Sequence, residues 1–173
     1  MKTILETERL RLREFSQNDT DFIIDLLNSP GWIKYIGDRK VKTKEDAFAY
    51  LENGPLKSYK DNGYGLSMVE LIDGNVPIGM SGIINRKTLE TPDIGFAFLP
   101  GFEGKGYGFE IASAIVKHAR NLLGIPKISA ITLNDNVSSK KLLLKLGFSF
   151  SKYIKDPVTN EELLLYTFTT ENK

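Results

Sequence analysis

Four glycines lie close together just before a helical pattern near the middle of the chain. Residues 100–112 read PGFEGKGYGFEIA, and the glycines are Gly101, Gly104, Gly106 and Gly108. Glycine costs conformational entropy, so this density indicates that the backbone needs left-handed dihedrals or close approach to another group. Free backbone N–H groups at a helix start, together with the helix dipole, bind anions such as a pyrophosphate. The stretch therefore predicts an anion site.

Two familiar glycine motifs do not match this stretch. The P-loop requires a lysine followed by serine or threonine, whereas Lys105 is followed by Gly106. The dinucleotide fingerprint needs a third glycine where the chain has Phe109 or Ile111. A turn that only packs a helix tightly on a sheet is the alternative that the pattern leaves open.

The composition is typical of a soluble globular domain and excludes several kinds of chemistry. With 173 residues, we expect a single domain over residues 1–173. The absence of cysteine excludes disulfides, thiolate zinc sites and a cysteine nucleophile, and the single histidine, His118, excludes a multi-histidine metal site. We expect no metal cofactor. A net charge of +1 argues against direct nucleic-acid binding.

The start of the chain and its hydropathy bear on localisation. The sequence MKTILETERL is too polar for a signal peptide, and no apolar run approaches the ~18 residues of a membrane span. We therefore expect a cytoplasmic protein that does not bind membranes.

Hydrophobic periodicity and turn signals predict an α+β domain with a mixed, mostly antiparallel central sheet. We expect about six or seven strands flanked by about four helices, in the order β-α-α-β-β-β-α-β-α-β-β. One strand–helix–strand crossover centres on the glycine stretch, and residues 55–65 are expected to be a loop. The predicted helices are 16–29, 44–53, 107–122 and 139–147. The predicted strands are 10–15, 64–72, 76–84, 93–100, 127–133, 148–154 and 162–169.

Three segments carry motifs that follow one another in a recognisable order. They are TERLRLREFSQND at 7–19, IGFAFLPGFEGKGYGFEI at 94–111 and NVSSKKLLLKLGF at 136–148. Together they resemble the GNAT superfamily of acetyl-CoA-dependent N-acetyltransferases, and within it the RimJ/RimL-like branch that includes ribosomal-protein N-terminal acetyltransferases. The resemblance implies the GNAT fold and direct transfer of acetyl from acetyl-CoA to a primary amine in a ternary complex.

The resemblance places acetyl-CoA on the glycine stretch and on the strand before it. Backbone amides of the stretch are expected to hold the pyrophosphate, and the strand is expected to separate from its neighbour and pair with the pantetheine arm. Glu103 stands where the family usually has glutamine or arginine, and a carboxylate near a pyrophosphate is unfavourable unless it points away. The expected cofactor-binding residues are Phe98, Leu99, Gly104, Lys105, Gly106, Tyr107, Gly108, Phe109 and Asn136.

Three residues are expected to take part in the chemistry. The resemblance implies that Asn136 hydrogen-bonds pantetheine or the acceptor and that Ser139 protonates the departing thiolate. Taken alone, Asn136 reads equally well as a helix N-cap. Asp93, at the start of the strand facing the acceptor, is the best-placed general base. Other acid–base candidates that stay open are a water molecule, Glu90, Glu70, Tyr64 and Tyr153.

The acceptor is the least determined part of the prediction. In the family, the segment equivalent to 28–46 walls the acceptor site, which assigns Trp32 and Tyr35 to substrate binding. Trp32 as a plug in the core is the equal alternative. The acceptor is a protein N-terminal α-amine or a small molecule such as a polyamine, an antibiotic or an amino-acid derivative. A non-catalytic acyl-CoA-binding module is the alternative of another class, and some family members form homodimers.

Overall fold

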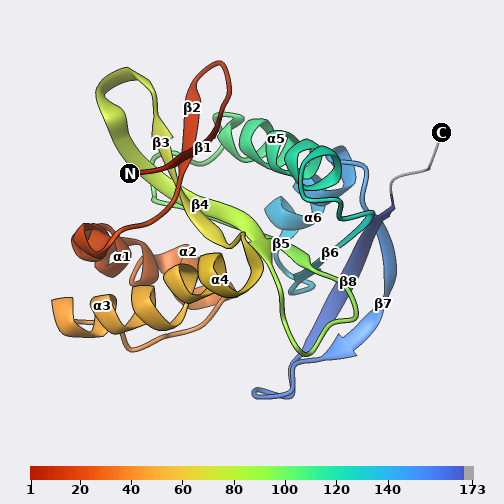
Figure 1. Cartoon of the computed structure of the whole chain (residues 1–173). Helices are drawn as coiled ribbons and strands as arrows, with labels where there is room; N and C mark the ends of the chain where they lie inside the picture. Colours follow the sequence, from red (N-terminus) through yellow and green to blue (C-terminus); the bar gives the residue numbers. More distant parts are fainter. Residues whose placement is uncertain (170–173) are drawn as a thin grey trace.

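An eight-stranded mixed sheet forms the centre of the computed structural model, which describes residues 1–169 (Figure 1). The strands are β1 (Thr3–Glu6), β2 (Leu10–Arg13), β3 (Leu66–Leu71), β4 (Val76–Ile84), β5 (Asp93–Phe98), β6 (Lys127–Thr132), β7 (Ser149–Lys155) and β8 (Glu162–Thr169). Their order across the sheet is β1-β2-β3-β4-β5-β6-β8-β7. Every neighbouring pair among these described strands is antiparallel except β5 and β6, which run parallel.

Six α-helices lie in two groups on opposite faces of this sheet within the described chain (Figure 1). One face is covered by α1 (Thr20–Leu27), α2 (Pro30–Tyr35), α3 (Lys44–Asn53) and α4 (Pro55–Asn62). The other is covered by α5 (Tyr107–Asn121) and α6 (Val137–Lys145). Short 3₁₀ turns, η1 (Gln17–Asp19) and η2 (Asp73–Asn75), complete the elements. Within residues 1–169, no helix has the length and apolar character needed to cross a membrane.

The predicted α+β class, the mostly antiparallel sheet and the crossover are confirmed, and the structure adds β1, α2 and α4. The loop expected at 55–65 is wrong, because Pro55 occupies the first turn of α4 and Gly63, with φ +77°, ends that helix in the left-handed conformation. Likewise Pro30 begins α2 rather than only ending the helix before it. Proline favours the first helical turn because its missing N–H is not needed there.

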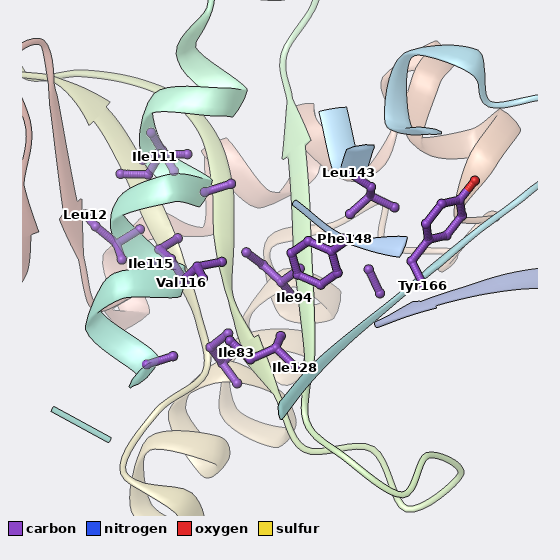
Figure 2. Close-up of a cluster of buried hydrophobic side chains, with 14 of the residues drawn as sticks. Leu12, Ile83, Ile94, Ile111, Ile115, Val116, Ile128, Leu143, Phe148 and Tyr166 are labelled. Carbon is purple, nitrogen blue, oxygen red and sulfur yellow. The ribbon is translucent and has the colours of Figure 1, made fainter. Parts of the chain in front are cut away.

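The larger core lies between the sheet and α5 (Figure 2). Ile111 and Ile115, four residues apart on α5, face the sheet and are at most 3% exposed. Leu12 of β2, Ile83 of β4 and Ile94 of β5 meet them from the sheet. This packing fixes the axis of α5, and therefore the place where its N-terminus begins.

A second core lies between the sheet and α1–α4. Leu26 of α1, Trp32 of α2 and Leu51 of α3 pack there with Met80 of β4. The residues of β5 alternate between the two cores: Ile94 belongs to the α5 side, whereas Ala97 packs on the α1–α4 side. The α1–α4 helices thus cover the face to which odd-numbered residues of β5 point.

A buried ion network ties α1 to the sheet. The Arg13 Nε atom donates to Glu70 Oε1 at 2.7 Å, and its two terminal nitrogens donate to the two carboxylate oxygens of Asp19 at 3.0 and 2.9 Å. Arg13 and Glu70 are each only 6% exposed. Removing one partner of such a buried group leaves the other charges without compensation, which is strongly destabilising.

We predict that Arg13→Met lowers the free energy of unfolding by about 3–5 kcal/mol, because Glu70 and Asp19 lose their counter-charge. Urea denaturation measures the change. Lys2→Met is the control, since Lys2 pairs with Glu14 at 2.9 Å on the surface, where an ion pair contributes about 0–1 kcal/mol. Equal changes in the free energy of unfolding for Arg13→Met and Lys2→Met would contradict a special stabilising role of the buried network.

The same network predicts an acid dependence of stability. Burial alone would raise the pKa of Asp19, but the hydrogen bonds from Arg13 and Ser16 outweigh it and hold that pKa below the ordinary 3.8. The resulting stabilisation is present at neutral pH and is lost as the pH falls below about 4 through the lower pKa of the folded state. The Arg13→Met variant should lose this part of the acid dependence in the same urea titrations.

Candidate active site

The sheet opens between β5 and β6. These strands pair at one position, Asp93 with Ser129, where the Ser129 N–H donates to Pro92 O at 2.9 Å. Beyond it, β5 pairs only with β4, and β6 only with β8. We call the unpaired region between their C-terminal halves the β5–β6 opening. The backbone groups that face this region have no strand partner there, and such groups can pair with an extended ligand.

The register of β5 decides which backbone groups face the opening. The Leu99 N–H donates to Ile78 O at 2.8 Å, toward β4. Because alternate residues of an antiparallel strand direct their backbone groups to opposite sides, Phe96 and Phe98 direct theirs toward the opening. Of the predicted pair, Phe98 therefore offers its backbone there. Leu99 has its N–H engaged, and its side chain packs on the α1–α4 side.

The glycine stretch forms the predicted strand–loop–helix junction. Gly101, Gly104 and Gly106 have φ values of +89°, +71° and +83°, a region that glycine adopts freely and that few other residues, mainly asparagine and aspartate, tolerate. Gly106 is the N-cap of α5, which no side chain caps in the described structure. The first intrahelical bond runs from Glu110 N to Gly106 O at 3.1 Å, so the N–H groups that precede Glu110 stay available to an anion.

Gly104 and Gly108 require glycine for different physical reasons. Gly104 is exposed, and a Cβ there would meet nothing within 4 Å. Packing therefore does not require glycine at this position, whereas the positive φ favours it. A Cβ at Gly108 would lie 3.3 Å from Leu142 Cδ2 and 3.5 Å from Phe98 Cε2. Gly108 therefore lets α6 and β5 approach α5 closely. The packing alternative is confirmed at this position, and an anion site at Gly104 stays a prediction.

Cations and aromatic rings surround the loop. Arg9 lies over the Tyr107 ring with its Cζ 4.5 Å from the centroid, and Lys145 Nζ lies 4.2 Å from the centroid of Phe109. Lys105 is exposed, with its Nζ 5.6 Å from the Phe102 ring centroid. The charges of Lys105 and Lys145 favour an anionic ligand at the loop, whereas Arg9 is paired with Glu110.

The unusual Glu103 side chain approaches α2. One carboxylate oxygen lies 3.7 Å from the place that a Cβ on Gly31 would occupy, in the first turn of that helix. The partial positive charge of a helix start is a favourable environment for a carboxylate. Glu103 thus contacts the α1–α4 face, which is consistent with a carboxylate turned toward α2 rather than into the loop.

Asn136 and Ser139 lie at the start of α6. The Asn136 Oδ1 atom accepts a hydrogen bond from Ser139 N at 3.2 Å, so the N-cap interpretation is confirmed. Both residues are half-buried. The starts of α5 and α6 both follow the C-terminal ends of the parallel strands β5 and β6, the usual place for a ligand where a sheet changes its connectivity. A ligand role for either residue stays a prediction.

Asp93 lies at the base of the β5–β6 opening and is fully buried. Arg86 Nε lies 3.0 Å from each of its carboxylate oxygens. Burial raises the pKa of Asp93, and the positive charge of Arg86 opposes that rise only in part. A raised pKa suits a carboxylate that accepts a proton near neutral pH. By contrast, Glu70, an alternative base, is engaged by Arg13.

The two predicted acceptor residues differ in exposure. Trp32 is 6% exposed and packs in the second core, which agrees with the core interpretation. Its indole Nε1 is nevertheless the buried side-chain donor for which the described residues offer no hydrogen-bond partner. Tyr35 is half-buried, with Lys34 Nζ 4.8 Å from its ring centroid. The structure therefore places Trp32 behind the wall rather than on its surface.

Sequence reasoning missed three residues that contact this region. Arg9 and Glu110 bind each other beside the loop, and Arg86 binds Asp93. Arg9 and Glu110 each fall inside a motif segment, TERL and GFEI, and that shared membership was the available signal. Arg86 lies between β4 and β5, and no spacing rule connects it to Asp93.

Comparisons with known proteins show what the whole chain is similar to. The sequence model of the acetyltransferase (GNAT) domain matches residues 9–149. The N-acetyltransferase YoaA of Bacillus subtilis, itself uncharacterized, is 26% identical over 150 residues, which cover 86% of this chain and 84% of YoaA.

Solved structures show the same fold. An acetyltransferase from Agrobacterium tumefaciens superposes with a TM-score of 0.82 at 22% identity, over 98% of this chain and 95% of that one. RimL, a ribosomal L7/L12 α-N-protein acetyltransferase in complex with coenzyme A, superposes with a TM-score of 0.80 at 16% identity, over 97% and 98%. At these identities the likeness concerns the fold.

We predict that Gly108→Val lowers the free energy of unfolding by about 1–3 kcal/mol, because its side chain overpacks against Leu142 and Phe98. Urea denaturation measures the loss. In a Leu142→Ala background the same substitution should cost less, since the nearest atom is gone. Strictly additive effects of the two substitutions would contradict the packing role of Gly108.

Proposed function

The chain belongs to the GNAT acetyltransferase family, and we propose that it transfers the acetyl group of acetyl-CoA directly to a primary amine. The observation that carries the proposal is the β5–β6 opening with the glycine loop at its C-terminal end. The opening exposes backbone groups for an extended arm, and the loop offers unpaired amides for a pyrophosphate. Coenzyme A joins these two chemical features in one molecule.

The proposed binding mode uses backbone groups almost entirely. The N–H groups of Gly104, Gly106, Gly108 and Phe109 hold the pyrophosphate at the start of α5, with the charge of Lys105 nearby. The pantetheine arm runs through the opening beside Phe96 and Phe98 as an added strand. Asn136, already the N-cap of α6, keeps its side-chain amide N–H₂ for a carbonyl of that arm. The Tyr107 ring supports the loop through its contact with Arg9.

The proposed reaction is a direct acyl transfer. The neutral amine attacks the thioester carbonyl carbon, a C–N bond forms, and the negative charge moves to the carbonyl oxygen, where the Phe98 N–H stabilises it. The C–S bond then breaks as the carbonyl re-forms. Ser139 delivers a proton to the departing thiolate and regains one from solvent. Asp93 takes the proton that the amine nitrogen loses, by way of a water molecule, and returns it to solvent. The products are the N-acetylated acceptor and coenzyme A.

We place the acceptor on the α1–α4 face of the opening. Ala97 and Leu99 of β5 point to that face, Trp32 packs behind them, and Tyr35 lies on the same helix as Trp32. A protein N-terminal α-amine is the acceptor that we propose first, because the fold is shared with an α-N-protein acetyltransferase of a ribosomal protein. A small-molecule amine is the alternative, and an acetylation screen with peptides and polyamines separates them.

We predict that Gly104→Asp weakens acetyl-CoA binding at least about tenfold, because it adds a carboxylate where the pyrophosphate is proposed to lie. Isothermal titration measures the affinity. Asparagine and aspartate both tolerate the left-handed backbone, so Gly104→Asn is the neutral match of the same shape. Gly63→Asp is the distant match, since Gly63 has φ +77° and its Cβ would also meet nothing within 4 Å.

The three variants separate the explanations for a loss. Equal weakening in Gly104→Asp and Gly104→Asn would point to bulk rather than charge, and weakening in Gly63→Asp would point to a general effect on the fold. Absence of binding in the folded wild-type chain, freed of co-purified coenzyme A, would overturn the proposed function.

We predict that Asp93→Asn lowers kcat at least about 100-fold and removes the acidic limb of the pH–rate profile, because a proton acceptor must be ionised. In Arg86→Gln that limb should move to higher pH, since Arg86 is the charge that lowers the pKa of Asp93. Initial rates of thiol release measure both. Asp73→Asn, in the exposed turn η2, is the control. If the acidic limb is unchanged in Asp93→Asn, Asp93 is not the general base and serves only as the ion-pair partner of Arg86.

A further inference from the structure

The turn between β1 and β2 lies against the first turn of α5, although the two are 101 to 103 residues apart in the chain. Glu110 Oε1 accepts hydrogen bonds from Thr7 Oγ1 at 2.6 Å and from Arg9 N at 3.0 Å. Its other oxygen accepts from Arg9 Nε at 2.7 Å and lies 2.7 Å from Arg9 Nη2. We call Thr7, Arg9 and Glu110 the Glu110 cluster.

The Arg9 side chain extends from this cluster onto three consecutive residues of the loop. Its Nη1 donates to Lys105 O at 3.1 Å. Its Nη2 lies 3.4 Å from the position of a Cβ on Gly106, and its Cζ lies 4.5 Å from the ring centroid of Tyr107. These are the residues at which the chain turns from left-handed loop into helix. The guanidinium therefore holds the backbone whose amides would face the pyrophosphate.

Charge in the cluster is balanced. A lone carboxylate in the first turn of α5 would repel a pyrophosphate at the same helix end. Burial alone would raise the pKa of Glu110, but the hydrogen bonds from Thr7 and Arg9 outweigh burial and keep that pKa below its ordinary value. Glu110 thus stays ionised, and Arg9 offsets its charge. The carboxylate acts as a fixed anchor for Arg9.

Global stability is a weak explanation for this arrangement. Arg9 is 43% exposed at its side chain, and ion pairs with one exposed partner contribute little to stability. A comparable pair, Arg11 Nε with Glu6 Oε1 at 2.7 Å, lies two residues further along β2 and touches no part of the loop. The feature that distinguishes the Glu110 cluster is its bond to the loop backbone.

We propose that Thr7, Arg9 and Glu110 are positioning residues that hold the glycine loop in the conformation that binds coenzyme A. The inference rests on the proposed function and goes beyond it, because it assigns the N-terminal strand turn to cofactor binding. Through the cluster, the first strands of the sheet and the loop after β5 act as one unit. The predicted effect of losing it is weaker cofactor binding with little change in kcat at saturating acetyl-CoA.

A positioning role and a purely electrostatic role of Glu110 predict opposite changes in coenzyme A affinity for Glu110→Gln. The substitution removes a negative charge near the pyrophosphate, so a purely electrostatic role predicts tighter binding. In the cluster, however, an amide N–H₂ group would face the guanidinium, and Arg9 would lose its anchor. Positioning therefore predicts that isothermal titration shows at least about tenfold weaker coenzyme A binding. Tighter or unchanged binding would overturn the proposal.

Matched variants extend the test to the other two residues. Arg9→Gln should raise the KM for acetyl-CoA at least about tenfold with kcat changed less than about twofold, whereas Arg11→Gln should leave both unchanged. Thr7→Val should weaken binding and Thr7→Ser should restore it, because only serine returns the hydroxyl. Melting curves check that every variant is folded. Failure of the serine rescue, or an equal effect of Arg11→Gln, would contradict positioning.

Amide hydrogen exchange of the free protein provides a readout that needs no ligand. The amides of residues 110–112, which close the first hydrogen-bonded turn of α5 on the loop, should exchange at least about tenfold faster in Arg9→Gln and Glu110→Gln than in the wild type or Arg11→Gln. If the wild type binds coenzyme A and the variants bind it equally well, the positioning role is refuted and the proposed function stands. If the wild type does not bind coenzyme A, the proposed function is refuted. If amide exchange in Arg9→Gln and Glu110→Gln is also the same as in the wild type, the positioning of the loop is refuted as well.

Discussion

The separation of β5 from β6 is the constraint on which the rest of the structure depends. A strand inside a sheet normally satisfies its backbone on both sides, and Phe96 and Phe98 direct theirs to a side where β6 does not pair with them. The single pair Asp93–Ser129 keeps the two strands in one sheet. Pairing beyond it would close the space that an extended ligand needs. The antiparallel neighbours β4 and β8 hold the two halves in place.

The crossover from β5 through α5 to β6 places the glycine loop and the start of α5 at one end of this opening. Because the strands are parallel, both helices that follow them begin beyond the same end of the sheet, and the first turn of α5 packs against Leu142 in the middle of α6. Contact between the helices requires a small residue, which is Gly108 against Leu142. Glycine is therefore needed in the loop for two separate reasons. Left-handed backbone at Gly104 and Gly106 turns the chain, and the missing Cβ at Gly108 allows close packing.

The N-terminal segment connects these parts through residues that alternate along one strand. Leu10 and Leu12 enter the core beneath α5, while Arg13 on the other face joins Glu70 and Asp19 under α1. Just before the strand, Arg9 reaches the start of α5. A short stretch therefore fixes the sheet, the α1–α4 face and the loop relative to one another. This gives a physical reason for the motif at residues 7–19, which sequence alone presented only as a likeness.

Local sequence determined the types and order of most elements and the place of the glycine loop, because hydrophobic period, caps and left-handed glycines are read within a few residues. It did not give β1, α2 or α4. The Asn136 cap was predictable for the same reason. Only the tertiary structure decided that Leu99 has its N–H engaged, that Arg86 pairs with Asp93, and that Arg9 and Glu110 meet beside the loop. Strand register, the contact of Arg86 in a connecting loop with Asp93, and the contact of Arg9 with Glu110 across 101 residues all depend on how whole elements pack. No local pattern encodes them, so these partners emerge only when the chain is folded.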